Sequence, residues 1–356
     1  MSDVTVSMIQ TVLNDFKDPE SGAPLLPSQI HDLRVDKGRI SFQLALTTWA
    51  WPIGEHVKKS LEKVLRAKDP QISQVVIQLT KLDRPPQPLG DIGLTVKSVI
   101  AVGSGKGGVG KSTIAASIAV GLKRGGAAVG LMDADVYGPS IPHLFGVSQR
   151  PEVVDKKLRP IDVGGMPVMS MGFLVPPGEA VVWRGPMLHG AITQFLRDTA
   201  WGALDYLIID MPPGTGDIAL TLSQLLPLAG AVVVCTPQDV ALLDAVKAIA
   251  MFRKVNIHVL GMVENMSGFV CPDCGNRYDI FGSGGARRRA AELAVPFLGE
   301  VPINMQIRVL GDAGQTAASF NDATCAPYLE QICQNLIINL AEIAGEKASQ
   351  PQLPSL

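Results

Sequence analysis

Cysteine is scarce in this chain, with only five among 356 residues. The number is odd and the spacing is irregular, which excludes the disulfide framework of a small secreted domain. We therefore expect free thiols and a cytoplasmic protein.

An excess of charge of one sign is also missing, because the net charge is −2. Such a chain has no global electrostatic attraction to nucleic acid or to an anionic membrane, so we expect neither among its partners. Long hydrophobic runs are absent as well: residues 225–235 are interrupted by proline and are too short to span a bilayer. Residues 1–15 lack the apolar core of a secretory signal.

What the chain does have is an apolar fraction of 47% and 36 glycines. The length suggests two domains, or one large domain with an appendage. Residues 1–82 predict a small α/β domain with helices over 6–16 and 53–66 and strands over 30–35, 40–46 and 75–79. Residues 83–97 open with a proline-rich polar stretch, which predicts an extended linker.

Residues 98–345 alternate short apolar strands with helices. Because the strands are continuously apolar rather than alternating, we expect burial on both faces and a doubly wound, mostly parallel sheet. The predicted strands are 99–102, 128–132, 206–209, 231–235, 258–263 and 297–299, and the predicted helices are 111–124, 187–199, 240–255, 285–293 and 326–343. Residues 346–356 are expected to be a disordered tail.

A glycine-rich stretch separates the first of these strands from the first helix: Gly105-Lys106-Gly107-Gly108-Val109-Gly110-Lys111-Ser112-Thr113. The order of strand, glycine turn and helix is the context in which a G-x-x-x-x-G-K-[ST] match predicts a phosphate site. Backbone N–H groups and the helix N-terminus surround the phosphates. Lys111 would reach the β- and γ-phosphates of ATP, and the Ser112 hydroxyl would hold Mg²⁺.

Two later strands end in carboxylates, Asp133 and Asp135 after the second strand and Asp210 after the third. The carboxyl ends of parallel strands line the crevice in which such sheets bind ligands. Asp210 is expected near Mg²⁺, and the loop 212–217 could sense the γ-phosphate.

Cys271 and Cys274 form a C-x-x-C knuckle, with Pro272 and Gly275 favouring the turn. A tetrahedral thiolate site needs four ligands, and the other cysteines do not form a second knuckle. A two-fold homodimer would supply the missing pair. Zinc, a [4Fe–4S] cluster and a redox disulfide all remain open on the residues alone.

The phosphate loop resembles the deviant loop of the MinD/ParA/nitrogenase-reductase group of ATPases. The resemblance implies that Lys106 reaches across a dimer to the partner's nucleotide. It also implies that Asp135 positions or activates the attacking water, that Asp210 is the acid on the magnesium side, and that Asn265 reads adenine. In that reading Asp133 supports Asp135.

Several motifs together are similar to the Mrp/ApbC family: residues 182–187, 135–140, 201–217, and 265–267 with the knuckle behind them. The resemblance implies a homodimeric, slow ATP hydrolase that holds an iron–sulfur cluster at Cys271 and Cys274 and passes it to apoproteins. Scaffold or donor proteins would load it. Residues 1–82 resemble the small iron–sulfur-assembly domain often fused to this family, although Trp51 stands where a cysteine is common.

A different functional class is a MinD/ParA-like positioning ATPase with a structural zinc site. Such an ATPase needs a basic amphipathic segment or a basic face. The predicted closing helix, residues 326–343, carries Glu330 and Glu342 and no basic residue, which favours the cluster carrier.

Overall fold

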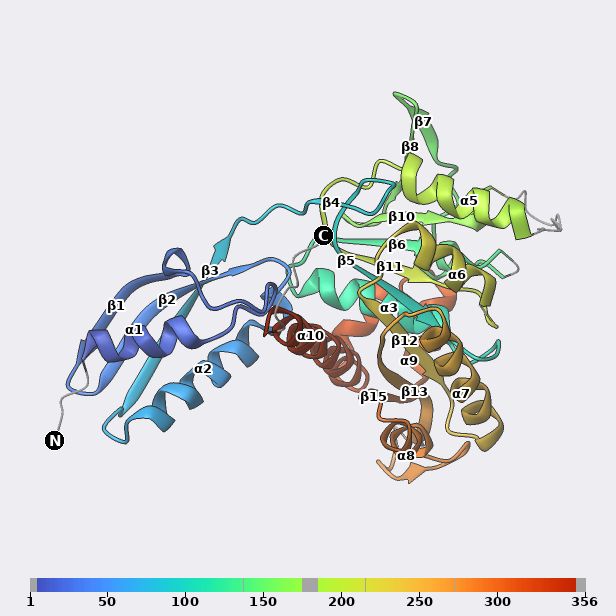
Figure 1. Cartoon of the computed structure of the whole chain (residues 1–356). Coiled ribbons are helices and arrows are strands. Elements are labelled where there is room, and N and C mark those ends of the chain that lie inside the picture. The colour runs from blue at the N-terminus through green and yellow to red at the C-terminus, as the bar shows by residue number, and fades with distance from the viewer. Residues whose placement is uncertain (1–4, 137, 175–184, 215, 272, 350–356) are drawn as a thin grey trace. The chain divides into compact units, whose positions relative to one another are not determined.

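The computed structural model describes residues 5–136, 138–174, 185–214, 216–271 and 273–349 (Figure 1). Two compact units make up the chain. The N-terminal unit comprises Met1–Pro85, Gly125–Ala127 and Ile337–Leu356, and the larger unit comprises Pro86–Arg124 and Ala128–Leu336.

The N-terminal unit contains the five predicted elements: α1 (Val6–Asp15), β1 (Ile30–Asp36), β2 (Arg39–Thr47), α2 (Gly54–Lys68) and β3 (Gln74–Leu82). Strands β1 and β2 pair antiparallel, whereas β3 returns through α2 and pairs parallel to β2. Thr5 caps α1 by accepting a hydrogen bond from the Met8 amide, as a threonine at this position commonly does. Ile9, Leu44 and Leu61 are fully buried, so both helices and the sheet share one core.

The larger unit is built on a mostly parallel sheet, as the sequence predicts. Its strand order is β14-β13-β12-β5-β11-β6-β10-β9, with β15 also beside β13 and β4 beside β5. The outer strands are β4 (Pro88–Leu89), β9 (Ile161–Asp162), β10 (Pro167–Ser170), β14 (Arg277–Tyr278) and β15 (Phe297–Ile303). The central strands are β5 (Leu94–Gly103), β6 (Val129–Asp133), β11 (Leu204–Asp210), β12 (Gly230–Cys235) and β13 (Val259–Val270). Every residue of β6, β11 and β12 is buried, because helices cover both faces of the sheet.

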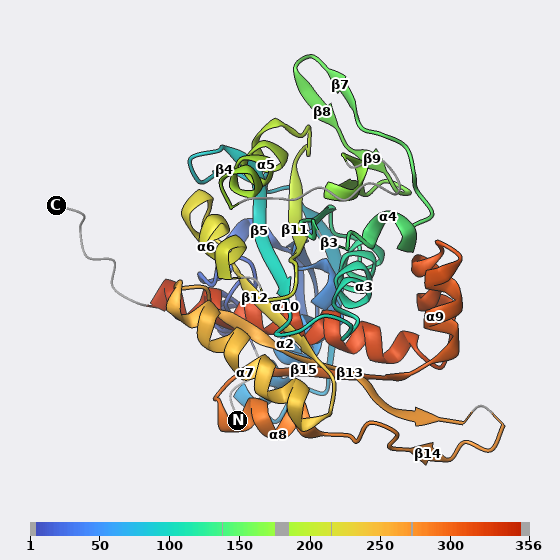
Figure 2. The same ribbon diagram turned by 90° about the vertical axis from the view of Figure 1, so that its right-hand side faces the viewer.

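Two helical layers enclose this sheet, as Figure 2 shows. Helices α5 (Gly185–Asp198), α6 (Gly216–Leu225), α7 (Asp239–Lys254) and α8 (Gly285–Glu292) follow one another along one face. On the other face lie α3 (Lys111–Arg124), α4 (Ile141–Leu144) and α9 (Met305–Asp312). Helix α10 (Ala326–Ser349) closes the chain, with its first part assigned to the larger unit and its last part to the smaller one.

The structure differs from the predicted linker at residues 83–97. Pro88–Leu89 form strand β4, which pairs antiparallel with β5, and β5 begins at Leu94. Leu94 and Val96 are buried in the main core. Part of the proline-rich stretch is therefore an edge strand. Proline is tolerated at a sheet edge because its lack of an N–H removes no hydrogen bond from the ladder there.

Other elements are longer than predicted or were not predicted. The predicted strand 258–263 continues to Val270, and the predicted strand 297–299 continues to Ile303 in β15 (Phe297–Ile303). The sequence did not predict helices α4, α6 and α9. It also did not predict the short strands β7 (Glu152–Val154), β8 (Lys157–Arg159), β9 (Ile161–Asp162), β10 (Pro167–Ser170) and β14 (Arg277–Tyr278). The strands are too short to show a period. Helix α10 runs to Ser349, beyond the predicted start of the tail, and residues 350–356 lie outside the described residues.

No helix in the described part of the chain is both long enough and apolar enough to cross a membrane.

Candidate nucleotide and thiolate sites

The phosphate loop lies between β5 and α3, and Lys111 is the first residue of the helix. Gly108 and Gly110 have φ angles of 77° and 79°, a region that glycine adopts without steric cost. At Gly105 a Cβ would lie 2.1 Å from the carbonyl oxygen of Asp244. These glycines therefore permit a backbone path that larger residues would block.

A cavity of about 380 Å³ opens over this loop. Three glycines of the loop line it together with both lysines, and the full set used here is Gly107, Gly108, Gly110, Lys106, Lys111, Ser112, Asp135 and Pro213. Lys106 is half-buried at this cavity. The arrangement gathers backbone amides and two lysines around a space suited to a polyphosphate.

Lys111 is the electrostatic centre of this cavity. Its Nζ lies 2.5 Å from Asp210 Oδ1, 3.8 Å from Asp135 Oδ2 and 3.2 Å from Ser112 Oγ. Lys111 is 6% exposed and Asp210 is completely buried. The strand-end acids of β6 and β11 and the lysine of α3 thus meet at one point, because β11 lies between β5 and β6 in the sheet.

Burial and mutual repulsion act on the acids behind this lysine. Burial, together with the nearby Asp210, raises the pKa of Asp133 to about 7. Burial also raises the pKa of Asp210, and this effect outweighs the positive charge of Lys111, which lowers it. The Asp133 carboxylate accepts hydrogen bonds from the Asp135 amide at 3.0 Å and from Ser170 Oγ at 2.9 Å. Asp133 therefore orients the turn that carries Asp135 and does not line the phosphate cavity.

The donor set fits Mg²⁺. Asp210 Oδ2 is buried and has no hydrogen-bond partner among the described residues. The Ser112 hydroxyl lies near the same Lys111 Nζ. A hydroxyl and a carboxylate are hard oxygen ligands of the kind that Mg²⁺ prefers beside a phosphate.

Asn265 lies next to the phosphate loop. Its Nδ2 donates a 2.9 Å hydrogen bond to the carbonyl oxygen of Val109. A second cavity, of about 360 Å³, is bounded by Gly110, Thr113, Asn265, Pro302 and Ile307. Asn265 therefore borders both the phosphate loop and this second cavity.

The cysteine knuckle projects from the far end of the same strand. Strand β13 ends at Val270, Cys271 follows, and the chain returns as β14, with Val270 opposite Arg277. The Cys271 amide donates to the Asn276 carbonyl at 2.9 Å. Cys271 is partly exposed and Cys274 is exposed. Both thiols are therefore accessible from solvent.

The backbone around Cys271 favours its thiolate form. Backbone N–H groups of Cys274 and Asp273 lower the pKa of Cys271. Burial raises the pKa of Cys325 to about 11 and that of Cys235 and Cys333 to about 12. A thiolate is the form that binds metal, so the knuckle is the thiol pair suited to ligation. Within the described residues no group of three or more histidine, cysteine or acidic side chains could hold a metal.

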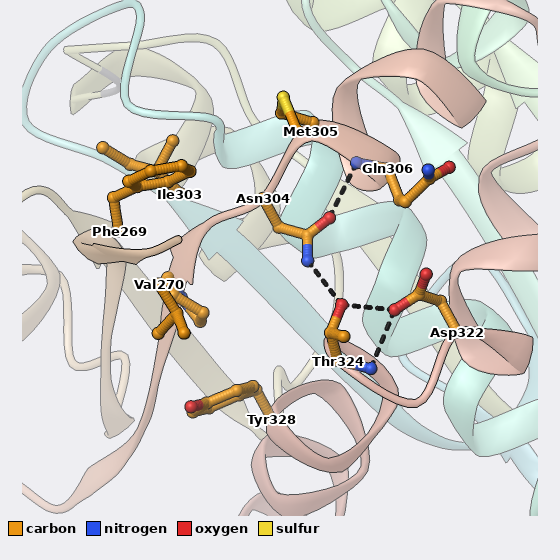
Figure 3. Close-up of a pocket in the computed structure, with 10 residues that line it drawn as sticks. Phe269, Val270, Ile303, Asn304, Met305, Gln306, Asp322, Thr324 and Tyr328 are labelled. Atoms are coloured by element: carbon orange, nitrogen blue, oxygen red, sulfur yellow. Dashed lines mark hydrogen bonds between the residues drawn. The ribbon is translucent and has the colours of Figure 1, made fainter. Parts of the chain in front are cut away.

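A pocket of about 460 Å³ lies beside the knuckle strand, and sequence reasoning did not find it (Figure 3). Phe269 and Val270 of β13 face it, as do Ile303, Met305 at the start of α9, and Tyr328 of α10. Its wall is held by Asn304, whose Nδ2 donates to Thr324 Oγ1 at 2.8 Å. The residues come from three distant segments, which leaves no local sequence signal.

Some of the motif residues used above lie outside the described residues. They are Tyr137, Thr215, Pro272 and residues 182–184.

Comparison with known proteins identifies the family of this chain. Residues 95–337 match the ParA family, described as the NUBPL iron-transfer P-loop NTPase. A protein of Deinococcus radiodurans named iron-sulfur cluster carrier protein is 46% identical over 340 residues, which cover 94% of this chain and 95% of the relative. One of the same name from Synechocystis sp. is 47% identical over 321 residues, covering 87% and 90%.

A solved structure, the nucleotide-binding protein in complex with ADP from Archaeoglobus fulgidus, is 44% identical with a TM-score of 0.56. The match covers 63% of this chain and 88% of that protein. The family match spans most of the larger unit, and the relatives extend over nearly the whole chain. The chain belongs to the ParA family of NUBPL-type iron-transfer P-loop NTPases.

Proposed function

We propose that this protein carries a [4Fe–4S] cluster and transfers it to apoproteins, with ATP binding and slow hydrolysis controlling the transfer. The observation that carries the proposal is the exposed knuckle with a lowered Cys271 pKa, borne on the strand that also carries Asn265 at the phosphate loop. The family and the names of its close relatives support the nature of the cargo.

The cluster is the cargo, and a single chain offers it two thiols. We propose that Cys271 and Cys274 of two copies hold it in a homodimer, because four thiolates complete a tetrahedral set. Scaffold or donor proteins would load the dimer and apoproteins would receive the cluster. Thiolate ligands need a reducing compartment, which agrees with the cytoplasmic location that we propose.

For the nucleotide, each residue has a proposed task. Lys111 leaves its contact with Asp210 to bind the β- and γ-phosphates, and the loop amides from Gly105 to Thr113 surround them. Ser112 and Asp210 would hold Mg²⁺, which neutralises developing phosphate charge when bound. Asp135 positions the attacking water, and Asn265 contacts the base.

Lys106 has a different proposed task. It adds positive charge at the partner's γ-phosphate as an arginine finger does, which stabilises the charge that accumulates during transfer. Hydrolysis therefore depends on the homodimer.

Anaerobic reconstitution with iron and sulfide, followed by absorbance and metal analysis, tests the cargo. We expect about one [4Fe–4S] cluster per dimer and none in Cys271→Ala or Cys274→Ala. The matched control is Cys333→Ala, because the Cys333 thiol is buried in the core and should not affect loading. A cluster retained by either knuckle variant would refute the proposal. Stoichiometric zinc without visible absorbance would favour a structural zinc site in a positioning ATPase.

A further inference from the structure

Strand β13 connects the two sites, and its middle is irregular. Asn265 contacts the phosphate loop, and Cys271 follows the end of the strand. Between them Met266 and Gly268 have φ angles of 59° and 69°. The pairing of β13 with β15 shifts register between Asn265 and Phe269. Such a bulge interrupts the ladder, and bulges commonly lie beside functional sites, where they redirect side chains.

Arg277 spans this bulge from the returning strand of the knuckle hairpin. Its Nη2 donates to the Ser267 carbonyl at 3.1 Å and lies 3.3 Å from Ser267 Oγ. Its Nη1 contacts Glu300 Oε1 of β15 at 3.2 Å, and its Nε contacts Asp279 at 3.2 Å. One planar guanidinium therefore ties the hairpin to β13 and to β15, in the fork geometry that arginine provides.

The contacts continue toward the nucleotide pocket. Ser267 Oγ lies 2.7 Å from Glu264 Oε1 and 3.0 Å from Glu300 Oε2. Glu264 is completely buried and immediately precedes Asn265. A continuous set of polar contacts thus runs from the residue beside Asn265, through Ser267, to Arg277 in the hairpin that carries the thiols.

Gly268 makes room for this arginine. A Cβ at Gly268 would lie 2.8 Å from Arg277 Nε and 2.9 Å from Asp279 Oδ1, in addition to the strain of the positive φ angle. The bulge and the arginine therefore fit each other, and a side chain at Gly268 would displace the guanidinium.

We propose that Arg277 is a positioning residue that locks the Cys271/Cys274 hairpin to the bulge of β13. Movement of β13 at Asn265, caused by nucleotide, is thereby passed to the two thiols. The biological role of this coupling rests on the proposed function, but the coupling itself can be measured without a cluster. The Arg277 side chain is 38% exposed, and exposed ion pairs contribute little to stability, so its removal should leave the fold intact.

The first experiment uses the full-length, metal-free protein. The alkylation rates of Cys271 and Cys274 by iodoacetamide are followed by peptide mass spectrometry without nucleotide, with ADP and with a non-hydrolysable ATP analogue. In the unaltered protein we expect nucleotide to change the rates about fivefold or more, the usual lower range of a coupling between sites. In Arg277→Ala the ratio of the alkylation rates with and without nucleotide should fall to about one. The affinity for nucleotide should change less than about threefold.

Three further variants test whether the effect depends on the position of the arginine, on its geometry rather than its charge, or on loss of the fold. Arg289→Ala removes a surface arginine that pairs with Glu292 on α8 and should keep the full nucleotide effect. Arg277→Lys keeps the charge but cannot serve Ser267 and Glu300 with one planar fork, so it should resemble Arg277→Ala. Gly268→Ala should also lose the coupling while its circular dichroism spectrum remains that of a folded protein.

The second experiment measures cluster transfer from the reconstituted protein to an apo-ferredoxin with the same nucleotides. Loss of the nucleotide effect on transfer in Arg277→Ala, with the cluster still bound, supports the inference. If the unaltered protein binds no cluster but shows coupled alkylation, the proposed function fails and the coupling stands. If nucleotide does not alter alkylation in the unaltered protein, or alters it equally in Arg277→Ala, the inference is wrong. Full coupling in Arg277→Lys would overturn the geometric argument.

Discussion

Lys111 has two tasks that a sequence motif does not separate. With ATP it is proposed to bind phosphate, whereas in the structure it is the counter-ion of Asp210, with Asp135 nearby. A buried carboxylate that loses its cation is costly, because the desolvation of the remaining charge is no longer offset.

We therefore expect Lys111→Ala to lower the free energy of unfolding of the nucleotide-free protein by about 3 kcal/mol, and to remove nucleotide binding. The loss lies at the low end for a buried pair because Asp210 can take up a proton. Urea denaturation measures the first effect and titration calorimetry the second. The double variant Lys111→Ala/Asp210→Asn should recover most of the stability; no recovery would mean that the lysine acts through packing instead.

Asp133 makes the stability of the nucleotide-free protein depend on pH. Its pKa is raised from 3.8 to about 7, so between these values the folded state holds a proton that the unfolded state has lost. The free energy of unfolding therefore falls as pH rises through this window, by an amount of the order of 4 kcal/mol for a shift of this size.

Asp133→Asn should make that slope shallower, whatever its own effect on stability, and the raised pKa of Asp210 accounts for what remains. Urea denaturation of both proteins at intervals between pH 4 and 8 provides the comparison. An unchanged slope in Asp133→Asn would assign the raised pKa to another group.

At the scale of elements, helix α8 begins on a side chain from a distant strand. Its N-cap, Gly284, offers no side chain, and Glu264 of β13 accepts hydrogen bonds from the amides of Gly284 and Ala286 at 2.7 Å and 2.6 Å. A carboxylate at a helix N-terminus satisfies unpaired N–H groups and interacts favourably with the helix dipole.

Glu264→Ala should therefore cost about 2–3 kcal/mol in the free energy of unfolding, because buried donors lose a charged acceptor. Thermal or urea denaturation measures it. The matched control is Glu292→Ala, near the end of the same helix and exposed to solvent, which should change stability by less than about 0.5 kcal/mol. Similar losses in the two variants would contradict the capping role.

The element scale also shows where sequence patterns succeed. Helices α3, α5 and α7 and strands β6, β11 and β12 were predicted within a few residues, because their periodicity or continuous apolar character is local. Strand β13 was predicted to end at residue 263, since Glu264, Asn265 and Ser267 are polar. They stay in the strand because partners from other elements, including Gly284, Val109 and Arg277, satisfy them.

At the scale of the whole molecule, the proposed function requires two copies. The knuckle supplies two thiols, and Lys106 is half-buried at the phosphate cavity without reaching Asp210 as Lys111 does. Both observations are explained if the nucleotide and cluster sites are completed by a second chain.

We expect a non-hydrolysable ATP analogue to dimerise the metal-free protein and Lys106→Ala to weaken that dimerisation at least about tenfold, because one charge at a shared phosphate is lost. Sedimentation velocity measures the association. Lys123→Ala, which removes a lysine from the far end of α3, is the control. Equal dimerisation of Lys106→Ala and the unaltered protein would place Lys106 outside the interface.

The sequence by itself determined the features that depend on neighbouring residues: the phosphate loop, the strand-end acids, the thiol pair, and the mostly parallel sheet implied by continuously apolar strands. Turn and helix chemistry is local, and so it can be read from short segments. Only the tertiary structure decided which distant groups meet. The order of β5, β11 and β6 brings Lys111 to Asp210. The edge strand β4 and the buried start of β5 replace part of the expected linker. The fold of β13, β14 and β15 brings Arg277 to Ser267 and Glu300. These contacts depend on strand order and register, which the energy of the whole core selects and no single segment encodes.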